Sequence, residues 1–169
     1  MFIAKKNTMK DGVVEMRHLR KLKHPNILQT KESFFDSDDC MIMIVEFCGY
    51  GSLNHQLGVR VESSQCTPFP ETIIRKCCVD ILRALVHTHQ NSIAHMDMKS
   101  DNIVINGDST FKLADFGISR SIEKDGEKVK NLIGTGGYKS PEVANSNILT
   151  AKSDIWGLGC ILYLFCTVE

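Results

Sequence analysis

The chain has 169 residues, of which 43% are hydrophobic and 24% charged, as in an ordinary globular domain. That composition excludes disordered, collagen-like and low-complexity proteins, because enough apolar side chains are present to form a core. Twenty basic and twenty acidic side chains cancel to zero formal net charge, whereas a protein that binds nucleic acid through its phosphates normally has a basic excess, so we expect no nucleic-acid partner.

The first third of the chain predicts a short strand, a helix and two longer strands. An apolar run at residues 2–4 precedes a helix that begins at Asp11-Gly12, presents apolar side chains on one side, and stops before Pro25. The runs Ile27–Phe35 and Met41–Phe47 are typical of strands, and the Asp-rich stretch between them is typical of a hairpin turn. The glycines that follow, between residues 49 and 58, indicate irregular chain.

The remainder predicts two helices that flank a small hairpin. Apolar residues recur at helical spacing from about Pro70 to His89, which predicts a long amphipathic helix. The runs at 103–105 and 111–113 form a hairpin around an Asn-Gly turn. Residues 117–153 are polar and show no period, which predicts a long loop. A final helix is expected from Ser153 to Thr167.

Neither the cysteines nor the hydropathy pattern indicates a zinc site or a membrane segment. The seven cysteines do not form the paired C-x-x-C motifs that a zinc site would require. The N-terminal apolar stretch is too short for a signal peptide, and the longest apolar run, Ile155 to Val168, is shorter than a membrane span. We therefore expect a cytoplasmic protein with no membrane partner.

The informative stretch is HMDMKSDN at residues 95–102, between the long helix and the small hairpin. It is followed in order by D-F-G at 115–117, G-T at 134–135, S-P-E at 140–142 and D-I-W-G-L-G at 154–159. This order and spacing resemble the motifs of the eukaryotic protein-kinase family, of the Ser/Thr type. The resemblance implies an α+β, two-lobed fold that is incomplete: a partial antiparallel-sheet N-lobe at 1–48 and a partial helical C-lobe at 49–169.

The resemblance implies a role for each polar residue of these motifs. Asp97 would accept or orient the proton of the substrate hydroxyl, and Lys99 would offset charge on the transferred phosphoryl group. Asn102 and Asp115 would supply oxygen ligands to Mg²⁺. ATP and Mg²⁺ are therefore the expected cofactors, and a protein serine or threonine is the expected substrate. Thr135 would lie in the loop that meets the substrate residue, although an ordinary loop threonine is the alternative.

The first 48 residues resemble the nucleotide-binding side of the same family. Phe2-Ile3-Ala4-Lys5 resembles the strand whose lysine contacts the α- and β-phosphates, with Lys6 as the alternative lysine. For either residue, a merely solvated lysine is the other interpretation. Glu15, only ten residues beyond Lys5, matches the helix glutamate that pairs with that lysine. The remaining adenine-site residues implied by the resemblance are Ile3 and Val104 on the two faces of the base, Val45 as gatekeeper, and Glu46 and Cys48 as backbone hydrogen-bond partners.

Several further residues are given structural roles. The resemblance makes His95 a packing partner of Phe116 rather than a base, and makes Asp154 the tether of the catalytic loop. Glu142 belongs to the S-P-E motif of the activation segment. The other histidines show no partner arrangement in the sequence and are expected to be surface or core residues: His18, His24, His55, His87 and His89.

The sequence departs from the family pattern at both ends and at Met96. No glycine-rich loop precedes Phe2, and no helices follow the Trp156 helix, so we expect a truncated domain with one apolar side of that helix exposed or covered by a partner protein. Met96 replaces the arginine that normally binds a phosphorylated activation loop. Three hypotheses follow: an active Ser/Thr kinase impaired by truncation, a catalytically inactive kinase-like binding module, or a fragment of a longer active kinase.

Overall fold

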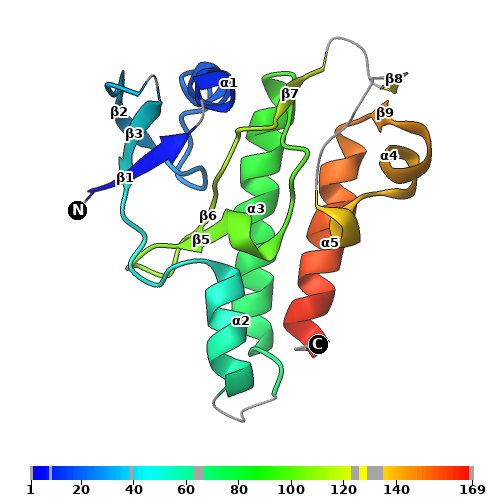
Figure 1. Ribbon diagram of the computed structural model, residues 1–169. Helices are drawn as coiled ribbons and strands as arrows, with labels where there is room; N and C mark the ends of the chain where they lie inside the picture. Colours follow the sequence, from blue (N-terminus) through cyan, green and yellow to red (C-terminus); the bar gives the residue numbers. More distant parts are fainter. Residues whose placement is uncertain are drawn as a thin grey trace.

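The computed structural model describes residues 2–7, 9–38, 40–62, 67–122, 126–128 and 135–167. These residues form a mixed α+β structure with small antiparallel sheets and five α-helices. The three-stranded sheet and α1 lie at one side of the molecule, and the long helix α3 runs through its middle with α2 and α5 beside it (Figure 1).

The first sheet has the strand order β1-β3-β2 and is antiparallel throughout. Its strands are β1 (Phe2–Asn7), β2 (Thr30–Phe35) and β3 (Met41–Glu46). Every second residue of the central strand β3 is buried, as expected for a strand with one face on a core. The second strand begins at Thr30 rather than at the predicted Ile27, because the backbone of residues 26–28 instead hydrogen-bonds to Leu113 in another sheet.

Helix α1 (Met9–Leu19) follows β1 almost directly and packs on β3. Gly12 makes this close approach possible, because a Cβ built at that position would lie 2.7 Å from the Cβ of Met41. The helix ends at Leu19, short of the predicted stop before Pro25. The chain turns there because the amides of Lys21 and Leu22 both bond to the carbonyl of His18, and Leu22 enters the core.

Helix α2 (Leu53–Glu62) lies where the glycines predicted irregular chain. The hydroxyl of Ser52 accepts a hydrogen bond from the amide of His55 at 3.2 Å, and Leu53 is completely buried. One glycine inside a helix costs about 1 kcal/mol relative to alanine, which is less than the burial of a leucine contributes. Packing therefore outweighs the local preference of Gly58.

The two long predicted helices are confirmed as α3 (Glu71–Gln90) and α5 (Lys152–Thr167). The hairpin β5 (Ile103–Ile105) and β6 (Phe111–Leu113) packs on α3. These elements share the main core. Its largest fully buried side chains include Ile81, Leu85, Ile103, Leu113, Phe116 and Phe165.

Residues 117–153, predicted as a long loop, contain several short elements. Strand β4 (Ile93–Ala94) pairs with β7 (Arg120–Ser121), and β8 (Glu127–Lys128) pairs with β9 (Ile148–Leu149). A 3₁₀ turn covers Gly136–Tyr138, and α4 spans Pro141–Ser146 with its proline at the first helical position. Elements of two to six residues are too short to produce a readable period.

One side of α5 is exposed, as expected above for the Trp156 helix. Trp156 is 49% exposed and Tyr163 is 62% exposed. Together with Tyr138, Cys160 and Leu164, they line a groove of about 630 Å³. Within the residues that the structure describes, no helix is both long and apolar enough to cross a lipid bilayer.

Candidate functional site

A buried carboxylate fixes the loop that carries Asp97. Asp154, at the start of α5, is 1% exposed and accepts hydrogen bonds from the backbone amides of His95 (2.8 Å) and Met96 (2.9 Å). His89, near the end of α3, places its Nε2 2.8 Å from the same carboxylate. Met96 has a φ of 67°, an unusual conformation for a residue with a side chain, which persists only where its surroundings determine it. The tether predicted for Asp154 is therefore confirmed, with His89 as an additional partner.

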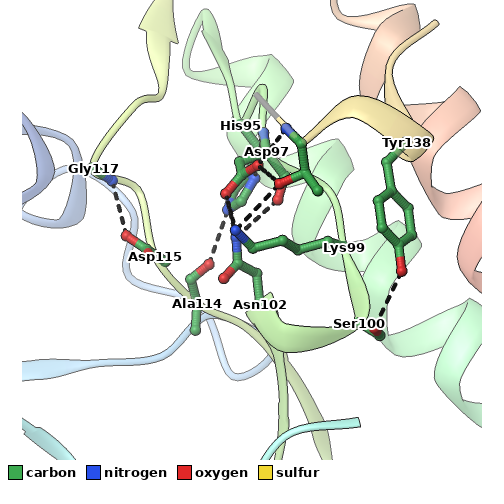
Figure 2. A network of polar contacts seen from close by, with 10 residues as sticks. His95, Asp97, Lys99, Ser100, Asn102, Ala114, Asp115, Gly117 and Tyr138 are labelled. Atoms are coloured by element: carbon green, nitrogen blue, oxygen red, sulfur yellow. Dashed lines mark hydrogen bonds and ion pairs between the residues drawn. The ribbon is translucent and has the colours of Figure 1, made fainter. Parts of the chain in front are cut away.

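His95 is a structural residue whose two ring nitrogens both have partners. Its Nε2 lies 2.9 Å from the carbonyl of Ala114, so this nitrogen must donate. Its Nδ1 accepts from the amide of Asp97 at 3.3 Å, and its ring packs edge-on against Phe116. The packing expected for His95 is confirmed. His95 thus joins the loop that carries Asp97 to the strand that leads into D-F-G (Figure 2).

Asp97 lies at the centre of a hydrogen-bond network with three other expected site residues (Figure 2). Lys99 Nζ lies 2.7 Å from Asp97 Oδ2, and Asn102 Nδ2 donates to the same oxygen at 3.0 Å. The hydroxyl of Thr135 donates to Asp97 Oδ1 at 2.8 Å, and its amide donates to the same atom at 3.2 Å. The structure therefore brings together side chains that are up to 38 residues apart in the chain.

The charges of this network stabilise each other. Partial burial acts to raise the pKa of Asp97, but the hydrogen bonds from Lys99, Thr135 and Asn102 outweigh it and hold the pKa below its usual value. Burial likewise acts to lower the pKa of Lys99, and the neighbouring carboxylates, foremost Asp97, outweigh it and raise that pKa. At neutral pH the site therefore holds an ionised acceptor beside a permanent positive charge.

Asp115 lies beside this network, in a turn with restricted backbone geometry. Its φ is 64°, and its carboxylate accepts the amide of Gly117 at 3.3 Å. The amide of Phe116 donates to Glu15 Oε1 of α1 at 3.3 Å, and Glu15 is only 3% exposed. The amide of Ala114 bonds to the carbonyl of Asn102 at 2.8 Å. This backbone hydrogen bond links Asn102, one expected magnesium ligand, to the residue before Asp115, the other.

The chemistry of these two ligands suits Mg²⁺. Asp115 offers a carboxylate, and Asn102 uses its Nδ2 towards Asp97, which leaves its amide oxygen as the acceptor. Mg²⁺ prefers oxygen ligands and is usually held by one or two protein groups together with phosphates and water. Among the described residues, no group of three or more His, Cys, Asp or Glu could hold a metal ion without such help.

Three expected adenine-site residues, Val45, Glu46 and Cys48, lie at or just after the end of β3, and Val104 lies in β5. Val45 is buried. The side chain of Glu46 is turned to Lys112 Nζ (2.9 Å) and to the amide of Gln29 (2.8 Å), and the Glu46 amide donates to the Gln29 carbonyl at 3.1 Å, so both groups are engaged within the protein. Burial, followed by the charge of Glu46, raises the pKa of the Cys48 thiol to about 11. Val104 is partly buried and bridges to Ser52.

Three sequence predictions remain apart from the Asp97 network. Glu142 lies at the start of α4, where Ser153 Oγ donates to it at 3.3 Å. Hydrogen bonding from its own backbone amide comes first among the causes that lower its pKa. The backbone of β1 places Ile3 opposite Val45 and Lys5 opposite Met43. The side chains of Ile3 and Lys5 lie outside the described part of the structure, so their assigned contacts stay predictions.

A comparison with models of known protein families identifies the family to which the chain belongs. A family model described as the protein kinase domain matches residues 3–169. The chain belongs to the protein kinase family. The residues that match that model include the Asp97 loop, the D-F-G turn and α5, which the structure has assembled around one network.

Curated relatives of this family are serine/threonine-protein kinases. The chain is 39% identical to Nek1 of Mus musculus over 155 residues, which are 92% of the chain and 12% of Nek1. It is 35% identical to Nek4 of Mus musculus, again over 92% of the chain and over 19% of Nek4. It is 32% identical to PLK4 of Xenopus laevis over 96% of the chain and 17% of PLK4. The chain thus spans less than a fifth of each of these relatives.

The sequence analysis missed several residues that organise the site. His18 and His89 were expected to have no partner arrangement, which is wrong: His18 Nδ1 lies 2.6 Å from Ser119 Oγ, and His89 contacts Asp154. Ser100 Oγ lies within 3.3 Å of Asn54 and Tyr138, and so links the loop to α2 and to the 3₁₀ turn. The partners of these residues are tens of residues away in the chain, and no local pattern predicts such pairs.

Proposed function

We propose that this chain transfers the γ-phosphate of Mg-ATP to serine or threonine hydroxyls of protein substrates. The observation that carries the proposal is the network of Asp97, Lys99, Asn102 and Thr135 beside Asp115. Its supports are the family match and the serine/threonine-protein kinases among the relatives. ATP and Mg²⁺ are the cofactors that this function requires, and bound Mg²⁺ would neutralise charge on the phosphates.

Asp97 would orient the substrate hydroxyl. Its Oδ1 accepts a hydroxyl proton from Thr135 at 2.8 Å, which is the kind of contact that a substrate serine or threonine would make. Phosphoryl transfer needs the attacking oxygen held in line more than it needs a strong base. A carboxylate whose pKa lies below its usual value stays ionised at neutral pH and suits that positioning role.

Lys99 and the two oxygen ligands would handle the phosphate charge. Lys99 Nζ lies between Asp97 (2.7 Å) and the Thr135 hydroxyl (3.3 Å), so its positive charge is next to the position expected for the attacking oxygen. Asn102 and Asp115 would hold the metal, and Lys5 would contact the phosphates from β1 with Glu15 as its partner. Positioned charges of this kind are the main source of catalysis in phosphoryl transfer.

The adenine would bind between the two parts of the molecule. We infer that residues 1–48 and 49–169 act as the two lobes of the kinase fold, with Val45, Glu46 and Cys48 at their connection. Ile3 and Val104 would then cover the two faces of the base. The segment of Thr135 and Glu142 would receive the substrate protein, and a partner protein would cover the exposed face of α5.

The test is transfer of labelled phosphate from Mg-ATP to a generic protein substrate, followed by phosphoamino-acid analysis. We expect phosphoserine or phosphothreonine, and we expect Asp97→Asn to lower kcat by about 10²- to 10⁴-fold, as for loss of a general base. The control Asp108→Asn changes a carboxylate in the exposed β5–β6 turn and should keep full activity. Transfer at an undiminished rate in Asp97→Asn would refute the proposal. Nucleotide binding without any transfer would instead favour a non-catalytic binding module.

A further inference from the structure

His18 of α1 makes a polar contact that the assigned kinase residues leave unexplained. It is 5% exposed, and its Nδ1 lies 2.6 Å from the hydroxyl of Ser119, which is 2% exposed. The two residues are 101 positions apart in the chain. Buried polar side chains that contact each other across such a separation fix the relative position of the segments that carry them.

The hydrogen atoms of this cluster can be placed by counting donors. The Ser119 hydroxyl has one proton, and it donates that proton to the carbonyl of Phe116. Its short contact with His18 Nδ1 therefore requires the imidazole to donate. The other ring nitrogen, Nε2, is then the acceptor in a neutral ring, and the Ser121 hydroxyl lies 3.4 Å from it. His18 thus carries its proton on Nδ1.

Together with Glu15, this contact connects the backbone of Phe116 to α1 through hydrogen bonds. Glu15 accepts the amide of Phe116 directly, while His18 acts on its carbonyl through Ser119. Glu15 and His18 are three positions apart in α1, so they project from the same face of the helix. Both backbone polar groups of Phe116, its amide and its carbonyl, are therefore connected to α1.

The residue that benefits is Asp115, immediately before Phe116. Its φ of 64° belongs to the left-handed region, which is strained for a residue with a side chain. Such a conformation persists when the neighbouring peptide units are held. The direction of the Asp115 carboxylate consequently depends on how firmly α1 holds Phe116.

We propose that His18 is a positioning residue of the kinase reaction. As a neutral imidazole protonated on Nδ1, it holds Ser119, and through Ser119 it fixes the Phe116 carbonyl and the orientation of the Asp115 carboxylate towards the metal. The inference rests on the proposed function, because it gives Asp115 the role of magnesium ligand. It adds a second link from α1 to the D-F-G turn, beside Glu15.

The test compares variants of the full chain that remove or keep the donor at this position. His18→Leu fills a similar volume without a donor, and His18→Asn keeps an N–H near the position of Nδ1. For His18→Leu we expect kcat to fall and the Mg²⁺ concentration for half-maximal activity to rise, each about five- to tenfold, the scale of one lost hydrogen bond. His18→Asn should restore most of both. The KM for the protein substrate should stay unchanged in both variants, and His55→Leu, an exposed histidine of α2, is the control.

Coupling to Ser119 distinguishes this role from a packing effect. Ser119→Ala should reproduce the shift in Mg²⁺ dependence, and the double variant with His18→Leu should be no worse than either single variant. Additive losses, an unchanged Mg²⁺ dependence in His18→Leu, or an Asn variant as impaired as the Leu variant would each overturn the proposal.

A readout without activity separates this inference from the proposed function. The nitrogen chemical shifts of His18 in the unmodified chain should show a protonated Nδ1 and an unprotonated Nε2, and the opposite tautomer would overturn the inference even if His18→Leu failed to fold. If the unmodified chain transfers no phosphate, the proposed function fails. In that case, hydrogen exchange at the Phe116 amide still tests whether His18 positions the Phe116 backbone. Faster exchange in His18→Leu than in the unmodified chain supports this role, and unchanged exchange contradicts it.

Discussion

The loop that carries Asp97 and the turn that carries Asp115 are held by different parts of the molecule. The backbone amides of this loop donate hydrogen bonds to Asp154 of α5, so the loop is held by the helical part of the molecule. The turn is held from α1, which packs on the small sheet. Among the described residues, the two are linked by His95, through its bond to Ala114 and its ring contact with Phe116, and by the backbone bond between Asn102 and Ala114. A displacement of α1 should therefore misplace Asp115 while Asp97 stays in position.

The largest effect is expected at the support of the catalytic loop. Asp154→Ala leaves the amides of His95 and Met96 buried without their acceptor, and loss of one partner of a buried charged group costs about 3–5 kcal/mol. We expect a loss of that size in the free energy of unfolding, measured by urea titration. Asp101→Ala, at an exposed neighbouring position, is the control. A loss below about 1 kcal/mol for Asp154→Ala would mean that other contacts hold the loop.

Two glycines of α5, the helix that holds the Asp97 loop, allow a matched comparison of two substitutions. A Cβ at Gly157 would lie 2.5 Å from the Cβ of Met98 in the catalytic loop, whereas a Cβ at Gly159 would meet no described atom within 4 Å. Overpacking costs about 1–3 kcal/mol, and the gain in helix propensity is about 1 kcal/mol. We expect Gly157→Ala to destabilise the chain by about 1–2 kcal/mol and Gly159→Ala to stabilise it slightly. Thermal unfolding measures both, and equal effects would contradict the close packing.

A smaller effect is expected at the support of the D-F-G turn. Glu15→Gln keeps an acceptor for the Phe116 amide but removes its charge, and charged hydrogen bonds exceed neutral ones by about 1 kcal/mol. We expect kcat to fall roughly five- to tenfold while the unfolding free energy falls by only about 1 kcal/mol. Glu32→Gln, on the exposed side of β2, is the control. A stability loss as large as that of Asp154→Ala would show that α1 supports more than the turn.

The smallest effect is a pH dependence of stability that His18 contributes. Burial, and then the charges of Lys21 and Arg17, lower its folded pKa below 6.5. The unfolded chain therefore binds a proton first as the pH falls, so the free energy of unfolding decreases from about pH 6.5 down to the folded pKa. His24 contributes in the same direction, since burial and its basic neighbours lower its pKa as well. We expect His18→Asn to reduce this slope in urea titrations at several pH values; an unchanged slope would refute the contribution.

The sequence analysis succeeded where residues act through local patterns. The long periodic segments became α3 and α5, and the spaced motifs around Asp97 and Asp115 identified the family that the comparison confirms. The chemistry expected of Asp97, Lys99 and Asn102 needs them to lie together, and the structure brings them within hydrogen-bond distance.

It failed where tertiary contacts decide. Helix α2 forms despite Gly58 because Leu53 is buried in the core, and the strand starting at Thr30 is shortened because residues 26–28 pair with Leu113. His18 and His89 contact residues 101 and 65 positions away. A single sequence carries no signal for such pairs, since each histidine looks like an ordinary residue of an amphipathic helix.

The most direct test of the claim that α1 holds the Asp115 turn while α5 holds the Asp97 loop is residue-resolved hydrogen exchange in Glu15→Gln. The account predicts faster exchange at the amide of Phe116 and unchanged exchange at the amides of His95 and Met96, because the latter two are held by Asp154. Faster exchange at all three amides, or no change at Phe116, would contradict the claim that α1 holds Asp115 independently of Asp97.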